Sequence, residues 1–101
     1  MFIYNVTTKI TWQIHEAWLQ WLQEIHAPEI IATGCFIKFQ ALRLQETDET
    51  EGPTYIFQYH AESKAQYNRY IELHAARFRQ DVITKWGDQF IAFRTLMEVI
   101  N

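Results

Sequence analysis

The stretch FIYNVTTKITWQIHEAWLQWLQEI, residues 2 to 25, changes its hydrophobic period part-way along, and this change decides the fold. Residues 2 to 10 alternate, with Phe2, Tyr4 and Val6 on one face, which is the period of a β-strand. From Thr11 onward the apolar residues recur every three or four positions, as on one face of a helix. The helical stripe consists of Ile14, Trp18, Trp21 and Ile25. The chain is therefore predicted to open with a strand followed by a helix.

The end of this helix is predicted near Ala27, because Pro28 disfavours the helical conformation of the residue before it. Pro28 can open a short new turn, PEIIAT, and Gly34 then provides a natural stop. His26 is accordingly interpreted as helix-end punctuation at the edge of the buried face. The helix dipole would favour a cation there.

The next segments are predicted to form a hairpin. CFIKFQALRLQ, residues 35 to 45, and TYIFQYH, residues 54 to 60, have strand patterns. Between them lies ETDETEGP, residues 46 to 53, an acidic stretch with Gly and Pro that is typical of a solvated loop. No internal linker, repeat or low-complexity segment interrupts the chain, and residues 1–101 are predicted to form a single domain.

A second helix and a final strand complete the pattern. Ser63 and Gln66 have the spacing of a capping box, which opens a helix running to Val82. DQFIAFRTLMEVI, residues 88 to 100, is predicted to be a long strand. The order βαββαβ is the ferredoxin-like α+β plan, a four-stranded antiparallel sheet with two helices on one face. We expect the first and third strands at its centre and the other two at its edges.

Alternation along the strands predicts which side chains face the helices and which lie on the open face. The predicted floor beneath the helices consists of Tyr4, Val6, Tyr55, Phe57, Tyr59, Ile91, Phe93, Met97 and Val99. The predicted open face carries Asn5, Thr7, Ile56, Gln58, His60, Ala92, Arg94, Leu96 and Glu98. The register of the second strand stays open, because neither of its faces is cleanly apolar.

Asn5, Gln58, His60 and Arg94 are the candidate ligand-binding residues on that open face. In one interpretation these polar groups satisfy one another, or a second copy of the chain, in a structural interface. In the other they line a small lumen and orient an anionic or carbonyl ligand, with Arg94 pairing with it and His60 acting as acid or base. Both interpretations predict a homodimer that pairs through the open sheet face.

Composition restricts the partners. Nine Lys and Arg against twelve Asp and Glu give a formal net charge of −3, and no basic run exists, so nucleic acid is not expected. An RNA-recognition domain would also need aromatic residues on the open face, whereas those of TYIFQYH are needed beneath the helices. No stretch approaches the roughly 20 apolar residues of a membrane span, and no signal peptide is evident. With one cysteine, Cys35, a cytoplasmic protein is expected.

Neither a metal site nor a cofactor is predicted. His15 and His26 are about 16 Å apart along a helix, too far to bind one metal. His74 lies in the apolar stripe of the second helix, where a core role is expected. No Ser or Cys has a base at a recognisable spacing, and Cys35 is expected to pack.

Two motifs carry a family resemblance. H-x-P-x4-T-G-x-F occurs in residues 26 to 36 and F-x-x-F-R-T-x-x-E-V in residues 90 to 99. The matching segments are YNVT, residues 4 to 7, WLQWLQEIHAPEIIATGCF, residues 18 to 36, LRLQETDETEGPTYIFQY, residues 42 to 59, YNRY, residues 67 to 70, and FIAFRTLMEV, residues 90 to 99. They follow one another in order and with similar spacing, so the resemblance extends over nearly the whole chain. The sequence resembles domain-of-unknown-function family 4286.

The resemblance implies a fold more than a chemistry. Such proteins are similar to dimeric α+β barrels, in which two ferredoxin-like subunits pair sheet to sheet. The family has no established activity and hence no catalytic residues to transfer. Enzymes of the wider architecture leave open an alternative to a binding or structural module, a cofactor-independent monooxygenase or isomerase acting on a small aromatic or carbonyl compound. Matching positions that merit tests are Tyr4, Asn5, His26, Pro28, Gly34, Gln58, Tyr59, Arg94 and Glu98.

Overall fold

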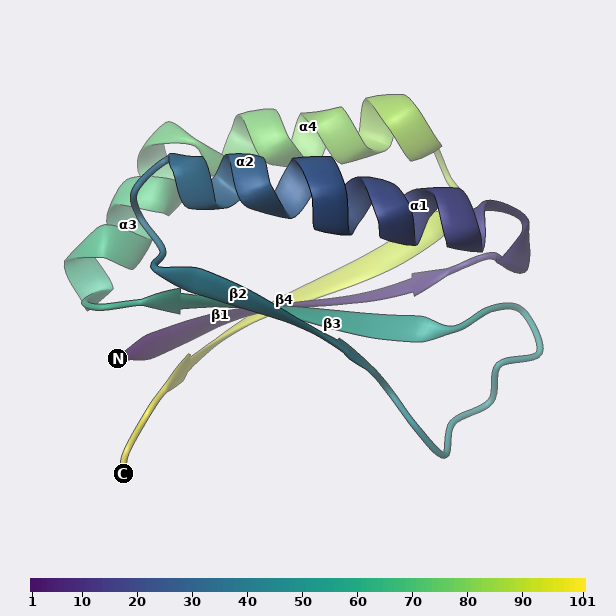
Figure 1. Ribbon diagram of the computed structural model, residues 1–101, viewed down its shortest axis with the longest axis horizontal. Helices are drawn as coiled ribbons and strands as arrows, with labels where there is room; N and C mark the ends of the chain where they lie inside the picture. The colour runs from purple at the N-terminus through teal and green to yellow at the C-terminus, as the bar shows by residue number, and fades with distance from the viewer.

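The computed structural model describes residues 1–101. The protein consists of two layers, and the first is a four-stranded antiparallel sheet (Figure 1). Its strands are β1 (Phe2–Ile10), β2 (Lys38–Arg43), β3 (Thr54–Ala61) and β4 (Phe90–Glu98). They lie in the order β2-β3-β1-β4, so the predicted central and edge positions are confirmed. All three pairings are antiparallel.

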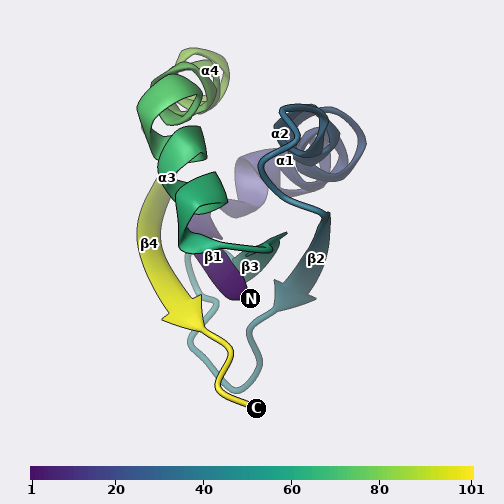
Figure 2. The same ribbon diagram turned by 90° about the vertical axis from the view of Figure 1, so that its left-hand side faces the viewer.

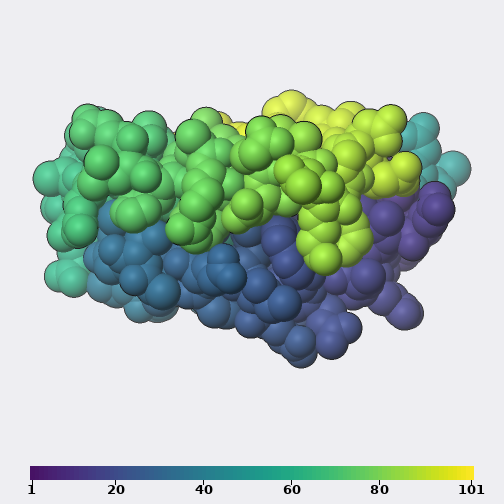
Figure 3. Space-filling model, turned by 90° about the horizontal axis from the view of Figure 1, so that it is seen from above, coloured from purple at the N-terminus to yellow at the C-terminus, as the bar shows by residue number.

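The second layer consists of helices that cover one face of the sheet (Figure 2). The first helical arm comprises a 3₁₀ turn (Trp12–Ile14), α1 (His15–Trp21), a π-helical turn (Leu22–His26) and α2 (Ala27–Ala32). The second comprises α3 (Lys64–Leu73) and α4 (Ala75–Trp86). Seen from above, the two arms lie side by side along the molecule (Figure 3). The ferredoxin-like α+β plan is thus confirmed.

The prediction that the first helix ends near Ala27 was wrong. The backbone N–H of Ala27 bonds to the carbonyl of Leu22, five residues back, and helix continues through Pro28 to Ala32. A π turn inserts one extra residue into a helix, which turns the following residues by about 100°. Ile25, predicted on the buried stripe, is consequently 48% exposed, whereas His26 is only 6% exposed.

Two other boundaries differ from prediction. The second strand begins at Lys38 rather than Cys35, because Cys35 and Phe36 are both buried in the core before the strand starts. The second helix does not run unbroken to Val82. It is interrupted at His74, whose φ of −128° and ψ of −31° depart from helical values. Its predicted start is confirmed, since the hydroxyl of Ser63 accepts a hydrogen bond from the backbone N–H of Gln66 at 3.2 Å.

The core between the two layers is largely aromatic. Tyr4 of β1 contacts the rings of Phe36, Tyr59 and Tyr70 at centroid distances of 6.0, 6.2 and 5.7 Å. Trp18 of α1 packs edge-on against Phe57 of β3 at 6.1 Å. The inward-facing residues predicted for β1 and β3 are confirmed.

No helix is both long enough and apolar enough to cross a bilayer.

The predicted face of β4 was wrong. Register places Arg94 opposite Val6 and Ala92 opposite Thr8, so the even-numbered residues of β4 face the helices. Ile91 and Phe93 lie on the open face, where they are 62% and 64% exposed. The large apolar side chains of β4 are not forced to face the helices, because β4 lies at the edge of the sheet. Small Ala92 fits beneath the helices, and the long side chain of Arg94 reaches from the edge.

Candidate functional site

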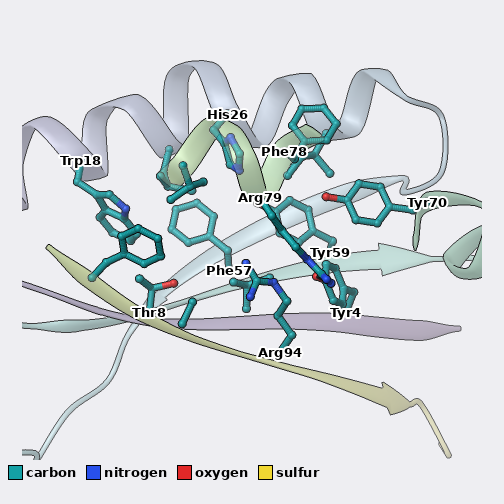
Figure 4. Close-up of a pocket in the computed structure, with 16 residues that line it drawn as sticks. Tyr4, Thr8, Trp18, His26, Phe57, Tyr59, Tyr70, Phe78, Arg79 and Arg94 are labelled. Atoms are coloured by element: carbon teal, nitrogen blue, oxygen red, sulfur yellow. Dashed lines mark hydrogen bonds between the residues drawn. The ribbon is translucent and has the colours of Figure 1, made fainter. Parts of the chain in front are cut away.

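The candidate site is a pocket between the helices and the helix-covered face of the sheet (Figure 4). The cavity volume is about 50 Å³, and the recess measures about 530 Å³ when its open mouth is counted. The inner space therefore holds a few water molecules, or a ligand group of similar size. The walls are mainly apolar and aromatic, a composition that favours organic ligands. Polar side chains that line it are Tyr4, Thr8, Tyr59, Tyr70, His26, Arg79 and Arg94.

His26 enters the pocket from the helical side because of the π turn. Trp18, Leu22, His26 and Ile30 follow at a constant spacing of four, and all four are buried and line the pocket. A spacing of four at every step exceeds the 3.6 residues of an α-helical turn and suits a helix with a wider turn. Sequence reasoning missed His26 as a pocket residue. The repeated spacing of four was the signal that could have indicated it.

The environment of His26 keeps its imidazole neutral at pH 7. Its ring stacks on Trp21 at a centroid distance of 4.6 Å and meets Phe78 edge-on at 5.6 Å. Burial lowers the pKa of His26 to about 4, against an opposing effect of the charge on Asp81 and with smaller lowering effects from Arg77 and Arg94. A neutral imidazole can donate one hydrogen bond and accept one.

Two arginines approach the pocket from opposite layers. Arg79 comes from α4, and its Nη2 donates a hydrogen bond to the hydroxyl of Tyr4 at 3.2 Å. Arg94 comes from β4, on the sheet side, and lines the same pocket (Figure 4). Burial raises the pKa of Tyr70, and the charges of Arg79 and Arg94 act in the opposite direction. The ion pairs of the protein are Arg43 with Glu49 and Arg77 with Glu29, so neither pocket arginine has a carboxylate partner.

Two fully buried donors in the pocket lining have no hydrogen-bond partner. They are Nε of Arg79 and Nε1 of Trp18, and both atoms are buried. Trp18 is only 1% exposed. Buried donors in folded proteins are nearly always paired, so an orphan donor beside a cavity calls for an explanation. The pocket therefore presents hydrogen-bond donors to whatever occupies it.

The structure does not bring the four predicted site residues together. Asn5 and Gln58 are cross-strand partners on the open face, and His60 lies on the same face. Arg94 is on the opposite side of the sheet, in the pocket. The prediction that all four residues share the open face is therefore wrong for Arg94. The two faces of β4 are the reverse of those predicted, which corresponds to a shift of one residue along the strand.

Within the open-face trio the polar groups are only partly satisfied. Nδ2 of Asn5 donates to Thr7 at 3.3 Å, while Oδ1 of Asn5 and Nε2 of His60 are buried without partners. Burial, followed by the charge of Lys38, lowers the pKa of His60. His15 belongs neither to the pocket nor to the open-face trio, and its Nε2 lies 2.7 Å from the hydroxyl oxygen of Tyr55. No cluster of three or more His, Cys, Asp or Glu side chains could hold a metal ion.

Comparison with known families identifies the chain. A family model described as "Domain of unknown function (DUF4286)" matches residues 1–100. The chain belongs to the DUF4286 family. No curated protein matches this DUF4286 chain in sequence.

Solved structures with the same fold are distant in sequence from the DUF4286 chain. A dimeric ferredoxin-like protein from an uncultured marine organism is 14% identical with a TM-score of 0.74, and 99% of this chain and 95% of that chain are covered. A putative antibiotic biosynthesis monooxygenase from Nitrosomonas europaea is 10% identical with a TM-score of 0.70, with both chains fully covered at 100%. SnoaB, a cofactor-independent oxygenase from Streptomyces nogalater, is 10% identical with a TM-score of 0.64, covering 99% and 94%. At these identities the similarity shows the fold alone.

Proposed function

We propose that this DUF4286 protein is a homodimeric binding module that holds a small organic molecule between its helices and its sheet. The observation that carries the binding role is the aromatic-walled cavity with orphan donors, Nε1 of Trp18 and Nε of Arg79, in its lining. A purely structural core would gain by pairing these donors or replacing them with apolar groups. A cytoplasmic location fits a chain whose one cysteine, Cys35, is free and buried.

The dimer is supported by the open face of the sheet. Ile91 and Phe93 project from it with more than half of their surface exposed, at 62% and 64%, and Leu42 and Met97 add 37% and 40%. Exposed apolar side chains gathered on one sheet face are typical of an interaction surface. The solved protein of the same fold from an uncultured marine organism is described as dimeric, which supports the same assembly here.

Filling the cavity tests the binding role. Ala92 lies on the floor of the pocket, and Ala92→Phe should occupy the space a ligand needs without adding a polar group. We expect small aromatic compounds to shift the NMR signal of the Trp18 indole N–H in the native protein and to leave it unmoved in Ala92→Phe. Ala65→Phe, at an exposed position on α3, is the matched control. Absence of any shift in the native protein would overturn the binding role.

A cofactor-independent oxygenase or isomerase is the second candidate. The observation in its favour is the neutral imidazole of His26, which is only 6% exposed and could exchange a proton with a bound carbonyl or phenol. Two solved proteins of the same fold are described as oxygenases. Oxygen uptake by the protein with an aromatic ligand, lost in His26→Phe while ligand binding persists, would establish this candidate over simple binding.

A further inference from the structure

The charged side chains that line the pocket are both positive, and the carboxylate of Asp81, which acts on His26, is not part of the lining. No Asp or Glu lines it, whereas Arg79 and Arg94 both do. Like charges that share a partly enclosed space repel more strongly than they do in water, because the local dielectric constant is lower. Neither guanidinium forms an ion pair within the chain, since the paired carboxylates are Glu49 and Glu29 with other arginines. The site as built has a surplus of positive charge.

The hydrogen-bonding capacity of the pocket has the same bias. Arg79 uses Nη2 for the Tyr4 hydroxyl, which leaves its Nε buried and unpaired. Nε1 of Trp18, which can only donate, is also unpaired, and its side chain is 1% exposed. Guanidinium groups match the two oxygens of a carboxylate, and such charge-assisted pairs are among the strongest hydrogen bonds in proteins. Acceptors with negative charge are what this pocket lacks.

We propose that the ligand is a small organic carboxylate. This inference rests on the proposed binding function and names the chemical class of its ligand. The carboxylate lies between Arg79 and Arg94, and the apolar part packs against the aromatic wall formed by Phe57 and Phe78. The inner cavity of about 50 Å³ admits only a few atoms, so the remainder of the ligand occupies the wider recess of about 530 Å³.

An isosteric pair of probes tests the charge of the ligand. Benzoate and benzamide have nearly the same shape, but only benzoate is an anion. We expect benzoate to bind the native protein at least about tenfold more tightly than benzamide, because only benzoate forms charge-assisted pairs. Inorganic phosphate serves as a third probe. If phosphate binds as tightly as benzoate, the organic part of the ligand contributes nothing and the proposal is overturned.

Substitutions at the arginines locate the interaction. Arg94→Ala should weaken benzoate by about tenfold or more and leave benzamide unchanged, and Arg94→Lys should fall between the two. Arg94 is exposed, so its removal does not leave a cavity in the core. Arg69→Ala, which removes the same charge from an exposed site on α3 outside the pocket, should leave benzoate binding unchanged.

The possible results separate this inference from the proposed function. Equal binding of benzoate and benzamide, both blocked by Ala92→Phe, would overturn the carboxylate and leave the binding role intact. If Arg69→Ala and Arg94→Ala weaken benzoate binding equally, the loss comes from the lower net charge of the protein and not from a contact in the pocket. This result would also overturn the inference. If neither compound shifts the indole signal of Trp18 at millimolar concentration, both proposals fail.

Discussion

His26 stays neutral because its ring is packed between Trp21 and Phe78, where water cannot solvate an imidazolium ion. The same packing makes it a pH-dependent element of stability. The unfolded chain takes up a proton at the histidine below its ordinary pKa of 6.5, whereas the folded protein does so only below about 4. Protonation therefore favours the unfolded state within this interval, and stability falls as pH falls from 6.5 to 4.

We expect this histidine to cost up to about 3 kcal/mol of stability between pH 7 and pH 4. His26→Phe retains an aromatic ring but cannot titrate, so its stability should fall less over the same range. Urea unfolding of both proteins at a series of pH values measures the difference. The effects of other groups that are protonated at low pH are common to both proteins and cancel in the comparison. Parallel curves for the two proteins would show that His26 is not held neutral.

At the scale of elements, only one of the two hydrogen bonds of a capping box is present at the start of α3. The Ser63 hydroxyl accepts from the backbone N–H of Gln66, but the side-chain oxygen Oε1 of Gln66 is buried without a partner. Ser63→Ala should lower the free energy of unfolding by about 1 kcal/mol, since it removes the N-cap. Gln66→Leu should be neutral or stabilising, because it removes an unpaired buried acceptor. Thermal unfolding of the two variants compares them directly. A loss in Gln66→Leu as large as that in Ser63→Ala would mean that the reciprocal bond forms.

The elements also show where sequence reasoning succeeds and where it stops. β1 was predicted to the residue, and the strand order followed from the βαββαβ pattern, because both depend on local periodicity and short connections. Pro28 predicts a helix stop, and this prediction leaves no place for the π turn, through which the helix continues. The wider turn places His26, instead of Ile25, against the core.

The site was predicted less well than the fold for a related reason. The phase of β4 depends on hydrogen-bond register with β1, and no local pattern in FIAFRTLMEV fixes it, since both of its faces carry apolar residues. Reversing this phase moved Arg94 from the open face into the pocket. Arg79, the other pocket arginine, had no signal of its own, because its role depends on the packing of α4 against β1 near Tyr4.

At the scale of the whole molecule, β4 serves both faces of the sheet with adjacent residues. Arg94 points into the pocket, and Phe93 points away from it onto the open face. A stable interface buries about 800 Å² per partner, and the open face of the sheet is the surface that would have to supply it. In a twofold dimer the same patch would meet its own copy.

We expect Phe93→Glu to convert the dimer to monomers, because each dimer would bury two unpaired carboxylates in an apolar contact. Light scattering at micromolar concentration should show the molar mass falling by half. Ile83→Glu makes the same change at a 52% exposed position on α4, away from the sheet, and should leave the mass unchanged. A native protein that is already monomeric, or a dimer that persists in Phe93→Glu, would contradict pairing through this face. Because Phe93 and Arg94 point to opposite sides, Arg94→Ala should weaken benzoate binding and keep the dimer, which separates the two roles of one strand.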